Sequence, residues 1–305
     1  MHVLVTGING QIGSRLSRHL SSQNIEHRGV DTTECFLKVP FLRCDLTDDS
    51  CLGELRKFVK PVTHVIHLAG KISTEKDFIS DLQPQFEISV VGTINLLSVL
   101  STNVTHVSYA SSMVVYGTPK SVEVDELSET SPEKSYAYGK LAAEMLLEYY
   151  GKTNKTPVAL MRLSSVYGPG RVTSRAIPSI IENVLNGERV MINGTGATIR
   201  DYVYIDDICD MMVKTSIERL NGVYNLSSGK GTSLKQLSEI IFKIISEQSV
   251  VSSEIEFRTE RLDGYSIILN RTKLNKELGH SCINNTLSGL RKTVQWHKTY
   301  RLEEG

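Results

Sequence analysis

The sequence predicts an α/β fold, a doubly wound parallel sheet followed by a smaller C-terminal α/β lobe. Two observations favour the sheet: short apolar segments alternate with helical patterns through about the first 165 residues, and a glycine-rich turn follows the first apolar segment. Such alternation is typical of parallel strands covered by helices on both faces. A third observation favours the lobe: after Ser164 the alternation stops, and a segment rich in Gly, Pro and Arg follows.

The individual elements follow from the same patterns. Apolar segments of strand length predict strands at residues 2–7, 26–31, 41–46, 63–69, 105–111 and 157–164. Helical spacing of apolar side chains predicts helices at residues 11–22, 49–59, 80–101 and 135–151, and in the second half at 176–186, 206–219 and 233–247.

The composition excludes several classes of protein. Lys plus Arg and Asp plus Glu number 34 each, and this balance argues against nucleic acid or an anionic membrane surface as the main partner. No apolar run approaches the ~20 residues that span a bilayer. The first strand candidate begins at residue 2, which leaves no room for a signal peptide. Five cysteines, an odd number without a CxxC pair, predict reduced thiols and a cytoplasmic protein.

No metal site is expected. His64 and His67 are three residues apart on a predicted strand, so their side chains should point to opposite faces. Asp206 and Asp207 precede a helical pattern, where an aspartate usually caps the free N–H groups of the first turn.

The turn after the first strand predicts a dinucleotide site in a sheet of the Rossmann type. Gly7, Gly10 and Gly13 lie between a strand and a helix, where a pyrophosphate needs a tight turn, close backbone approach and a helix N-terminus. The spacing is GxxGxxG, so it only approximates the GxGxxG fingerprint.

Asp31 ends the second predicted strand, 18 residues after Gly13. A carboxylate at this place accepts hydrogen bonds from the ribose hydroxyls of NAD and repels the 2′-phosphate of NADP. Two readings compete with this one. Asp31 could simply form a turn, and the nearby Arg28 could welcome a 2′-phosphate.

The segment SYAYGKLAAEM, residues 135–145, contains a candidate acid/base. On a helix Tyr136 and Lys140 are four residues apart and share a face, whereas Tyr138 points elsewhere. A phenol is a poor base at neutral pH, because its reference pKa is about 10, but a nearby ammonium stabilises the phenolate. We therefore expect Tyr136, not Tyr138, to transfer protons.

Taken together, these motifs resemble the extended short-chain dehydrogenase/reductases, specifically their nucleotide-sugar epimerase/dehydratase group. The matching segments run nearly end to end, in the order VTGINGQIG, CDLTD, HLAG, VVGTINLL, YASSMVVYG, SYAYGK, MRLSSVYGPG, NGTGATIRDYVYIDD and GVYNLSSG. The resemblance implies a nucleotide-sugar substrate, NAD as the cofactor and a homodimer built from helices near 80–101 and 136–150.

The resemblance also implies a role for each matching residue. Tyr136 would be the acid/base, Lys140 would hold the nicotinamide ribose and depress the pKa of the tyrosine, and Ser112 would hydrogen-bond the reacting sugar oxygen. The remaining cofactor contacts would be Gly7, Asn9, Gly10, Gln11, Ile12, Gly13, Asp31, Asp45, Leu46, Leu68, Ala69 and Gly70. Besides Ser112, the substrate contacts would be Ser165 and Arg200, with Arg171 and Arg261 as looser candidates for phosphate.

Residues 1–164 would then form the NAD-binding domain, with 198–228 returning to it, and 165–305 would mainly form the substrate-binding lobe. Two positions depart from the family pattern. Ser89 and Ser165 stand where asparagine is usual, so the contact of Ser165 with the substrate is open to loss or to mediation by water.

Several reactions share this scaffold. The dehydratases of the group carry Asp-Glu after the catalytic hydroxyl residue, and here Met113 and Val114 cannot transfer protons. A nucleotide-4-ketosugar reductase would consume a reduced cofactor, NAD(P)H and commonly NADPH, and Asp31 disfavours NADPH. We therefore expect a UDP-hexose 4-epimerase, with the reductase as the alternative. A dehydratase, a non-catalytic dinucleotide-binding protein and a steroid dehydrogenase follow behind.

Overall fold

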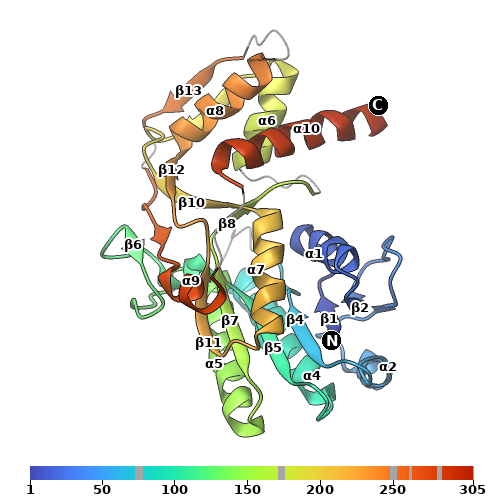
Figure 1. The fold of residues 1–305 in the computed structure, drawn as a ribbon. Coiled ribbons are helices and arrows are strands. Elements are labelled where there is room, and N and C mark those ends of the chain that lie inside the picture. The colour runs from blue at the N-terminus through green and yellow to red at the C-terminus, as the bar shows by residue number, and fades with distance from the viewer. Residues whose placement is uncertain (73–77, 171–175, 248–252, 261–262, 280–283, 305) are drawn as a thin grey trace.

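A seven-stranded parallel sheet forms the centre of the protein (Figure 1). The computed structural model describes residues 1–72, 78–170, 176–247, 253–260, 263–279 and 284–304. The strand order is β11-β7-β5-β4-β1-β2-β3, and each neighbouring pair is parallel. The strands are β1 (His2–Thr6), β2 (Glu26–Asp31), β3 (Phe41–Arg43), β4 (His64–His67), β5 (His106–Ser112), β7 (Val158–Leu163) and β11 (Gly222–Leu226). The predicted doubly wound sheet is confirmed, and its order reverses between β1 and β4, where such sheets bind ligands.

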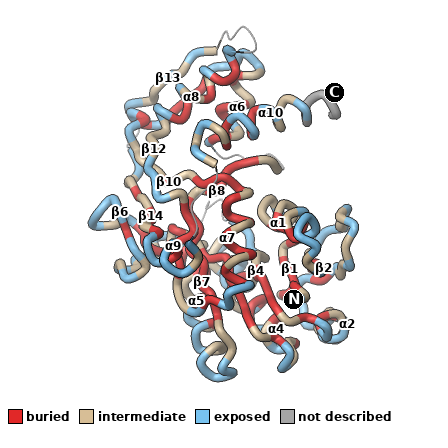
Figure 2. The backbone as a smooth tube through the Cα atoms, viewed as in Figure 1, coloured by how far each residue is buried: buried red, intermediate tan, exposed pale blue. Residues whose placement is uncertain are grey.

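Helices cover both faces of this sheet. The helices of the sheet domain are α1 (Gln11–Ser22), α2 (Leu52–Phe58), α3 (Phe78–Phe86), α4 (Gly92–Val99), α5 (Ser135–Asn154) and α7 (Ile205–Ile217). Strand β7 shows the two faces by alternation: Met161 packs in one cluster with Leu16 of α1, while Leu160 packs in another with Leu96 of α4 and Leu147 of α5. The buried strands lie between these two layers (Figure 2).

The predicted helix over 80–101 is three consecutive pieces. Helix α3 contains Pro84, a π-helical segment spans Glu87–Val91, and α4 follows. A proline cannot donate the backbone hydrogen bond of a regular helix, and apolar periodicity does not register a change of helix type. Ser89 of the π segment is buried against α5, because a Cβ at Gly139 would lie 3.1 Å from its Oγ. This residue therefore occupies a close helix crossing.

The smaller lobe lies beyond the carboxyl ends of the strands (Figure 1). It contains a β12-β10-β8 sheet and a parallel β13-β9 pair, and a β14-β6 pair lies alongside. Their bounds are β6 (Glu123–Val124), β8 (Ser165–Tyr167), β9 (Val190–Asn193), β10 (Ile199–Tyr204), β12 (Gly231–Ser233), β13 (Ile255–Arg258) and β14 (Ile268–Leu269). The helices of this half are α6 (Ala176–Asn186), α8 (Leu234–Ser246), α9 (Thr272–Leu278) and α10 (Thr286–Glu304).

Asp206 and Asp207 lie in the first turn of α7 and do not cap it. The N-cap residue is Tyr204, which makes no side-chain cap hydrogen bond. The carboxylate of Asp206 instead pairs with the guanidinium of Arg15 on α1, with 2.8 Å between Nη2 and Oδ2. Asp207 accepts a hydrogen bond from Asn284. The capping prediction is wrong, because side chains distant in sequence reach both carboxylates.

The prediction of reduced cysteines is wrong for one pair. Cys44 and Cys51 form a disulfide, and their Cα atoms are 5.7 Å apart, a separation that suits such a bridge. Cys35 and Cys209 are free. The short loop after β3 brings the two residues together, which spacing alone did not indicate. The cysteine argument for a cytoplasmic location therefore no longer holds.

The histidines of β4 are bonded within the protein. His67 is buried, with its Nδ1 2.6 Å from Thr6 Oγ1 and its Nε2 3.0 Å from Thr93 Oγ1. Burial lowers the pKa of His67 to about 3, so the ring is neutral at physiological pH. Within the described ranges no cluster of three or more His, Cys, Asp or Glu side chains could hold a metal, and no helix is long and apolar enough to cross a membrane.

Candidate active site

Two cavities adjoin the N-terminal end of α1. The smaller, of about 550 Å³, includes Gly7, Asn9 and Gly10 in its lining, and the larger, of about 720 Å³, includes Gln11 and Ile12. An extended ligand that crosses the glycine turn can therefore enter both. This position is the carboxyl edge of the parallel sheet, at the reversal of strand order.

The glycine turn between the cavities has no room for side chains. Gly7 has φ +68°, and a Cβ on Gly13 would lie 2.1 Å from the carbonyl oxygen of Gly7. Gly10 is the N-cap of α1 and has no side chain to bond the first N–H groups of the helix. These N–H groups and the positive end of the helix dipole form a place for a phosphate group.

The smaller cavity fits the adenosine half of a dinucleotide. Asp31 lines it at the end of β2, and its carboxylate accepts hydrogen bonds from Asn9 N at 2.9 Å and Thr32 N at 2.8 Å. The other predicted residues of this part also line the cavity, namely Asp45, Leu46, Leu68, Ala69 and Gly70.

Arg28 does not line the smaller cavity. Its guanidinium lies 4.8 Å from the ring centroid of Phe58 and donates to the Phe58 carbonyl oxygen. Its side chain is therefore bonded elsewhere. A 2′-phosphate in the smaller cavity would be repelled by the carboxylate of Asp31, and this arginine would not offset the repulsion.

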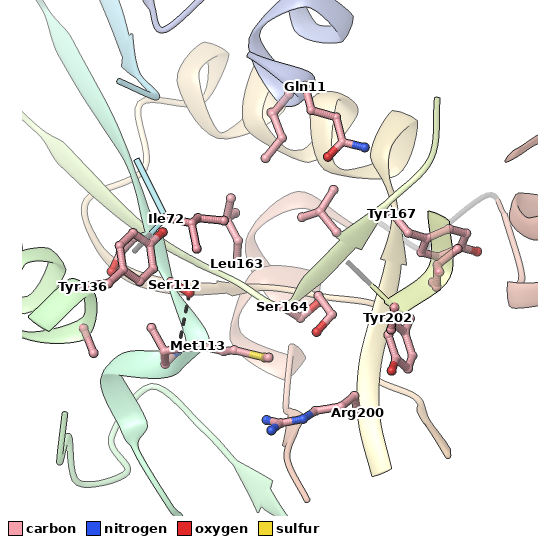
Figure 3. A pocket seen from close by; sticks show the side chains of 18 of the residues that line it. Gln11, Ile72, Ser112, Met113, Tyr136, Leu163, Ser164, Tyr167, Arg200 and Tyr202 are labelled. Carbon is pink, nitrogen blue, oxygen red and sulfur yellow. Dashed lines mark hydrogen bonds between the residues drawn. The ribbon is translucent and has the colours of Figure 1, made fainter. Parts of the chain in front are cut away.

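The larger cavity contains the candidate acid/base. Tyr136 and Ser112 both line it, and Figure 3 shows their side chains pointing into it. Tyr138 is 51% exposed and does not line the cavity. Helical geometry explains the difference, since two residues on α5 differ by about 200° in direction.

Lys140 lies beneath the tyrosine on the same helix face. It is buried, its Nζ donates to the carbonyl oxygen of Ala110 at 2.7 Å, and this ammonium lies 5.8 Å from the ring centroid of Tyr136. Burial lowers the pKa of Lys140 to about 8, while the negative charge of Glu144 opposes the shift. The lysine can therefore hold a positive charge close to the phenol at neutral pH.

The opposite part of the larger cavity carries the predicted substrate contacts that the structure describes. Ser165 and Arg200 line it, and the Arg200 guanidinium lies 4.2 Å from the ring centroid of Tyr265. Among the described residues Arg200 forms no ion pair, so its charge is available to an anionic ligand. Arg171 and Arg261 lie outside the described residues.

Sequence reasoning missed three further residues of this cavity. Tyr265 lines it, as do Tyr202 and Ser164, which Figure 3 labels. The hydroxyl of Ser164 is buried without a hydrogen-bond partner in the described structure. A buried hydroxyl without a partner is costly, so Ser164 is suited to bond a ligand. The serine pair in SSVYG was a possible signal, but nothing indicated that the chain leaves β7 there and turns both serines toward one cavity.

Known proteins are similar to the chain over nearly its whole length. It is 30% identical to a UDP-glucose 4-epimerase of Mycolicibacterium smegmatis, covering 98% of this chain and 99% of that protein. It is 29% identical to a "Probable dTDP-glucose 4,6-dehydratase" of Sinorhizobium fredii, covering 97% and 93%. The structure of a Thermus thermophilus UDP-glucose 4-epimerase complex with NAD superposes with a TM-score of 0.83 at 26% identity, covering 98% and 99%.

The family model gives the assignment directly. Residues 3–227 match the NAD dependent epimerase/dehydratase family. The glycine turn, the uncapped start of α1 and Asp31 fit the NAD on which this family depends. The chain is therefore an enzyme of the NAD-dependent epimerase/dehydratase family.

Proposed function

We propose that the enzyme is a nucleotide-sugar 4-epimerase, with a UDP-hexose as its substrate. The observation that carries this proposal is the set of groups in the larger cavity. Tyr136 and Ser112 line it, with the Lys140 ammonium beneath, whereas Met113 and Val114, which follow Ser112, offer no proton donor or acceptor. This set suffices for reversible oxidation of a hydroxyl but not for elimination of water.

Each residue has a distinct task in this proposal. NAD, when bound, would accept the hydride that leaves C4 of the sugar. Tyr136 takes the proton of the C4 hydroxyl, Ser112 hydrogen-bonds the same oxygen, and the Lys140 ammonium stabilises the phenolate. If the keto sugar rotates and presents its opposite face before the hydride returns, the configuration at C4 is inverted. Tyr136 would then give the proton back to the C4 oxygen.

The C-terminal lobe would hold the nucleotide diphosphate. Arg200 lines the cavity and forms no ion pair with any described residue, and a guanidinium suits phosphate oxygens because its N–H donors form a planar fork. The hydroxyl of Ser164, which has no hydrogen-bond partner among the described residues, and that of Ser165 lie in the same lining and would contact the sugar. These hydroxyls would take over the contact that the family makes through asparagine.

A 4,6-dehydratase is the second candidate, because the Sinorhizobium fredii relative is nearly as similar as the epimerase. Elimination of water needs an acid and a base near the leaving hydroxyl. Met113 and Val114 cannot serve, so we place this activity behind epimerisation.

The test is product identification with the purified enzyme and a panel of UDP-, dTDP- and GDP-hexoses. NMR should show a C4 epimer with no net consumption of NAD. A 4-keto-6-deoxy sugar would establish the dehydratase. A 4-hydroxyl product formed from a 4-ketosugar at the expense of NAD(P)H would establish the reductase.

Replacement of Asp31 should change the choice of cofactor. Asp31→Ala is expected to weaken NAD binding and to narrow its advantage over NADP, because the carboxylate bonds ribose hydroxyls and repels a 2′-phosphate. The same carboxylate accepts a hydrogen bond from Asn9 N. Asp31→Asn, which keeps an acceptor oxygen, therefore distinguishes the effect of losing the charge from the effect of losing this hydrogen bond within the loop. Calorimetric dissociation constants for both cofactors provide the measurement. Tighter binding of NADP than NAD by the wild type would contradict this role.

We further propose that the enzyme is a homodimer. Apolar side chains remain exposed along the α3–α4 stretch and along α5, namely Phe86, Val91, Ile94, Tyr138, Met145 and Tyr149, the last two at 67% and 68%. Exposed apolar side chains on helices that contact one another, as these do, are typical of a subunit interface. Light scattering should give twice the chain mass, and Met145→Glu together with Tyr149→Glu should give a monomer. A monomeric wild type at micromolar concentration would refute the proposal.

A further inference from the structure

A buried ion pair lies directly beneath the candidate active site. Arg162 of β7 donates to both carboxylate oxygens of Glu144 on α5, with Nε–Oε1 3.1 Å and Nη2–Oε2 2.8 Å. Both side chains are less than a tenth exposed. The Arg162 guanidinium also lies 4.8 Å from the ring centroid of Tyr116, whose hydroxyl donates to Asn225 Oδ1 at 2.8 Å.

Burial of this ion pair costs desolvation free energy, so its presence calls for a reason other than stability. Removing two charges from water carries a penalty that their attraction barely offsets, and apolar residues of similar size often stabilise a fold as well or better. The place of the pair in the fold is therefore more informative than its contribution to the free energy of unfolding.

Glu144 connects the catalytic helix to the catalytic strand. Along α5, Lys140 and Glu144 follow the tyrosine at intervals of four residues, so all three share one face. Lys140 Nζ donates to the carbonyl oxygen of Ala110, and the hydroxyl of Ser111 donates to Glu144. Two consecutive residues of β5 are thus tied to α5 immediately before Ser112, which lines the cavity.

The residue that lies opposite Ser111 on the neighbouring strand completes the arrangement. Ser111 is paired in register with Arg162 on the neighbouring strand β7. Glu144 therefore receives hydrogen bonds from two adjacent strands at one level of the sheet. A shift of α5 by one residue would break all of these hydrogen bonds. It would also move Tyr136 away from Ser112 of β5.

Glu144 is also the nearby anion of the buried ammonium. Lys140 faces the rings of Tyr109 on β5 and Tyr136 on α5, at 4.6 and 5.8 Å from their centroids. The other titratable groups around Lys140 are His67 of β4, whose pKa burial and the ammonium both lower, and Glu144 itself. Among the described residues Glu144 supplies a negative charge that favours the charged form of the lysine, in addition to the hydrogen bond to the Ala110 carbonyl oxygen and the contacts with the two rings.

We propose that Glu144, held by Arg162, is a positioning residue for the proton transfer: it fixes α5 in register with β5 and keeps the Lys140 ammonium charged. This role rests on the proposed function for its catalytic consequence, but the charge on Lys140 can be measured without a substrate.

The test uses Glu144→Gln, which keeps the size of the side chain and one of its two acceptor oxygens and removes its charge. Without that charge, burial dominates and the pKa of Lys140 falls, so the alkaline limb of the kcat/KM profile should move to lower pH by about one unit. The same fall should appear in NMR titration of protein labelled with carbon-13 at lysine Cε. Glu148→Gln is the matched control, because Glu148 lies one turn later on α5, is exposed and pairs only with Lys152 among the described residues. It should leave both measurements unchanged.

A purely structural role predicts a different outcome. In that case Glu144→Gln would lower the melting temperature while the alkaline limb and the Lys140 titration stayed in place, and the proposal would be overturned. If the unpaired Arg162 prevents folding, the double variant Glu144→Gln with Arg162→Met removes both charges, and its Lys140 titration must still move downward. If no nucleotide sugar is turned over by the wild type, the proposed function fails, whereas the NMR titration still decides the role of Glu144.

Discussion

Tyr136→Phe is expected to lower turnover of the sugar substrate by at least about 10²–10⁴-fold, the usual contribution of general acid–base catalysis. The substitution keeps the ring and its packing but removes the group that takes the proton from the C4 hydroxyl. Hydride cannot leave C4 unless that proton leaves, because the carbonyl cannot otherwise form. Binding of NAD should persist, since the glycine turn, Asp31 and Lys140 are unchanged. Steady-state turnover and calorimetric NAD binding together provide the measurement.

Tyr138→Phe is the matched control for this prediction. The residue lies two positions further along α5 and is 51% exposed, outside the cavity lining. Its loss of a hydroxyl should cost far less than about a hundredfold. If Tyr138→Phe were inactive while Tyr136→Phe remained active, the assignment of the acid/base would be wrong.

Gly13→Ala is expected to impair both folding and cofactor binding. A Cβ at this position would lie 2.1 Å from the Gly7 carbonyl oxygen and 2.8 Å from the Ile8 Cα, and both are backbone atoms that cannot rotate aside. The start of α1 must then move away from the end of β1. Overpacking of this kind costs about 1–3 kcal/mol in the free energy of unfolding. NAD affinity should fall at least tenfold, because about 1.4 kcal/mol of lost binding free energy corresponds to that factor.

Gly53→Ala is the control for the glycine turn. Gly53 lies within α2, and a Cβ there would meet no atom within 4 Å. Alanine in a helix interior is favoured over glycine by about 0.5–1 kcal/mol, so this variant should be as stable as the wild type or slightly more so. Denaturant unfolding and NAD titration of both variants make the comparison. Equal NAD affinity in Gly13→Ala and the wild type would show that the turn is not the phosphate site.

Local patterns predicted the strands and the glycine turn well, because each depends on the spacing of side chains within one short segment. Strands β2 and β5 lie within a residue of their expected positions, and a Cβ on Gly13 would meet the backbone of Gly7 and Ile8, only a few residues away. Tyr136 lines the cavity and Tyr138 does not, which follows from the geometry of one helix. In each case the period of the secondary structure carries the information.

What the sequence did not reveal depends on partners far along the chain. Asp206 is paired with Arg15, 191 residues earlier, and no pattern around the aspartate indicates it. Glu144 looks like an ordinary polar residue of α5 until Arg162 and Ser111 are placed against it. That the buried hydroxyl of Ser164 has no hydrogen-bond partner in the described part of the chain follows only from the placement of the surrounding side chains.

The membership of β11 in the main sheet has a consequence for synthesis of the protein on the ribosome. Strand β7 ends at Leu163, but its outer neighbour β11 begins only at Gly222, after the chain has passed through β8, α6, β9, β10 and α7. Until those residues emerge, the growing chain presents an unpaired strand edge and an uncovered apolar face around Met161. Such edges pair readily with other chains, so the nascent protein is most exposed to aggregation while its first half alone is available. The second half of the chain must therefore complete the sheet domain during folding, and the first half by itself is an incomplete sheet.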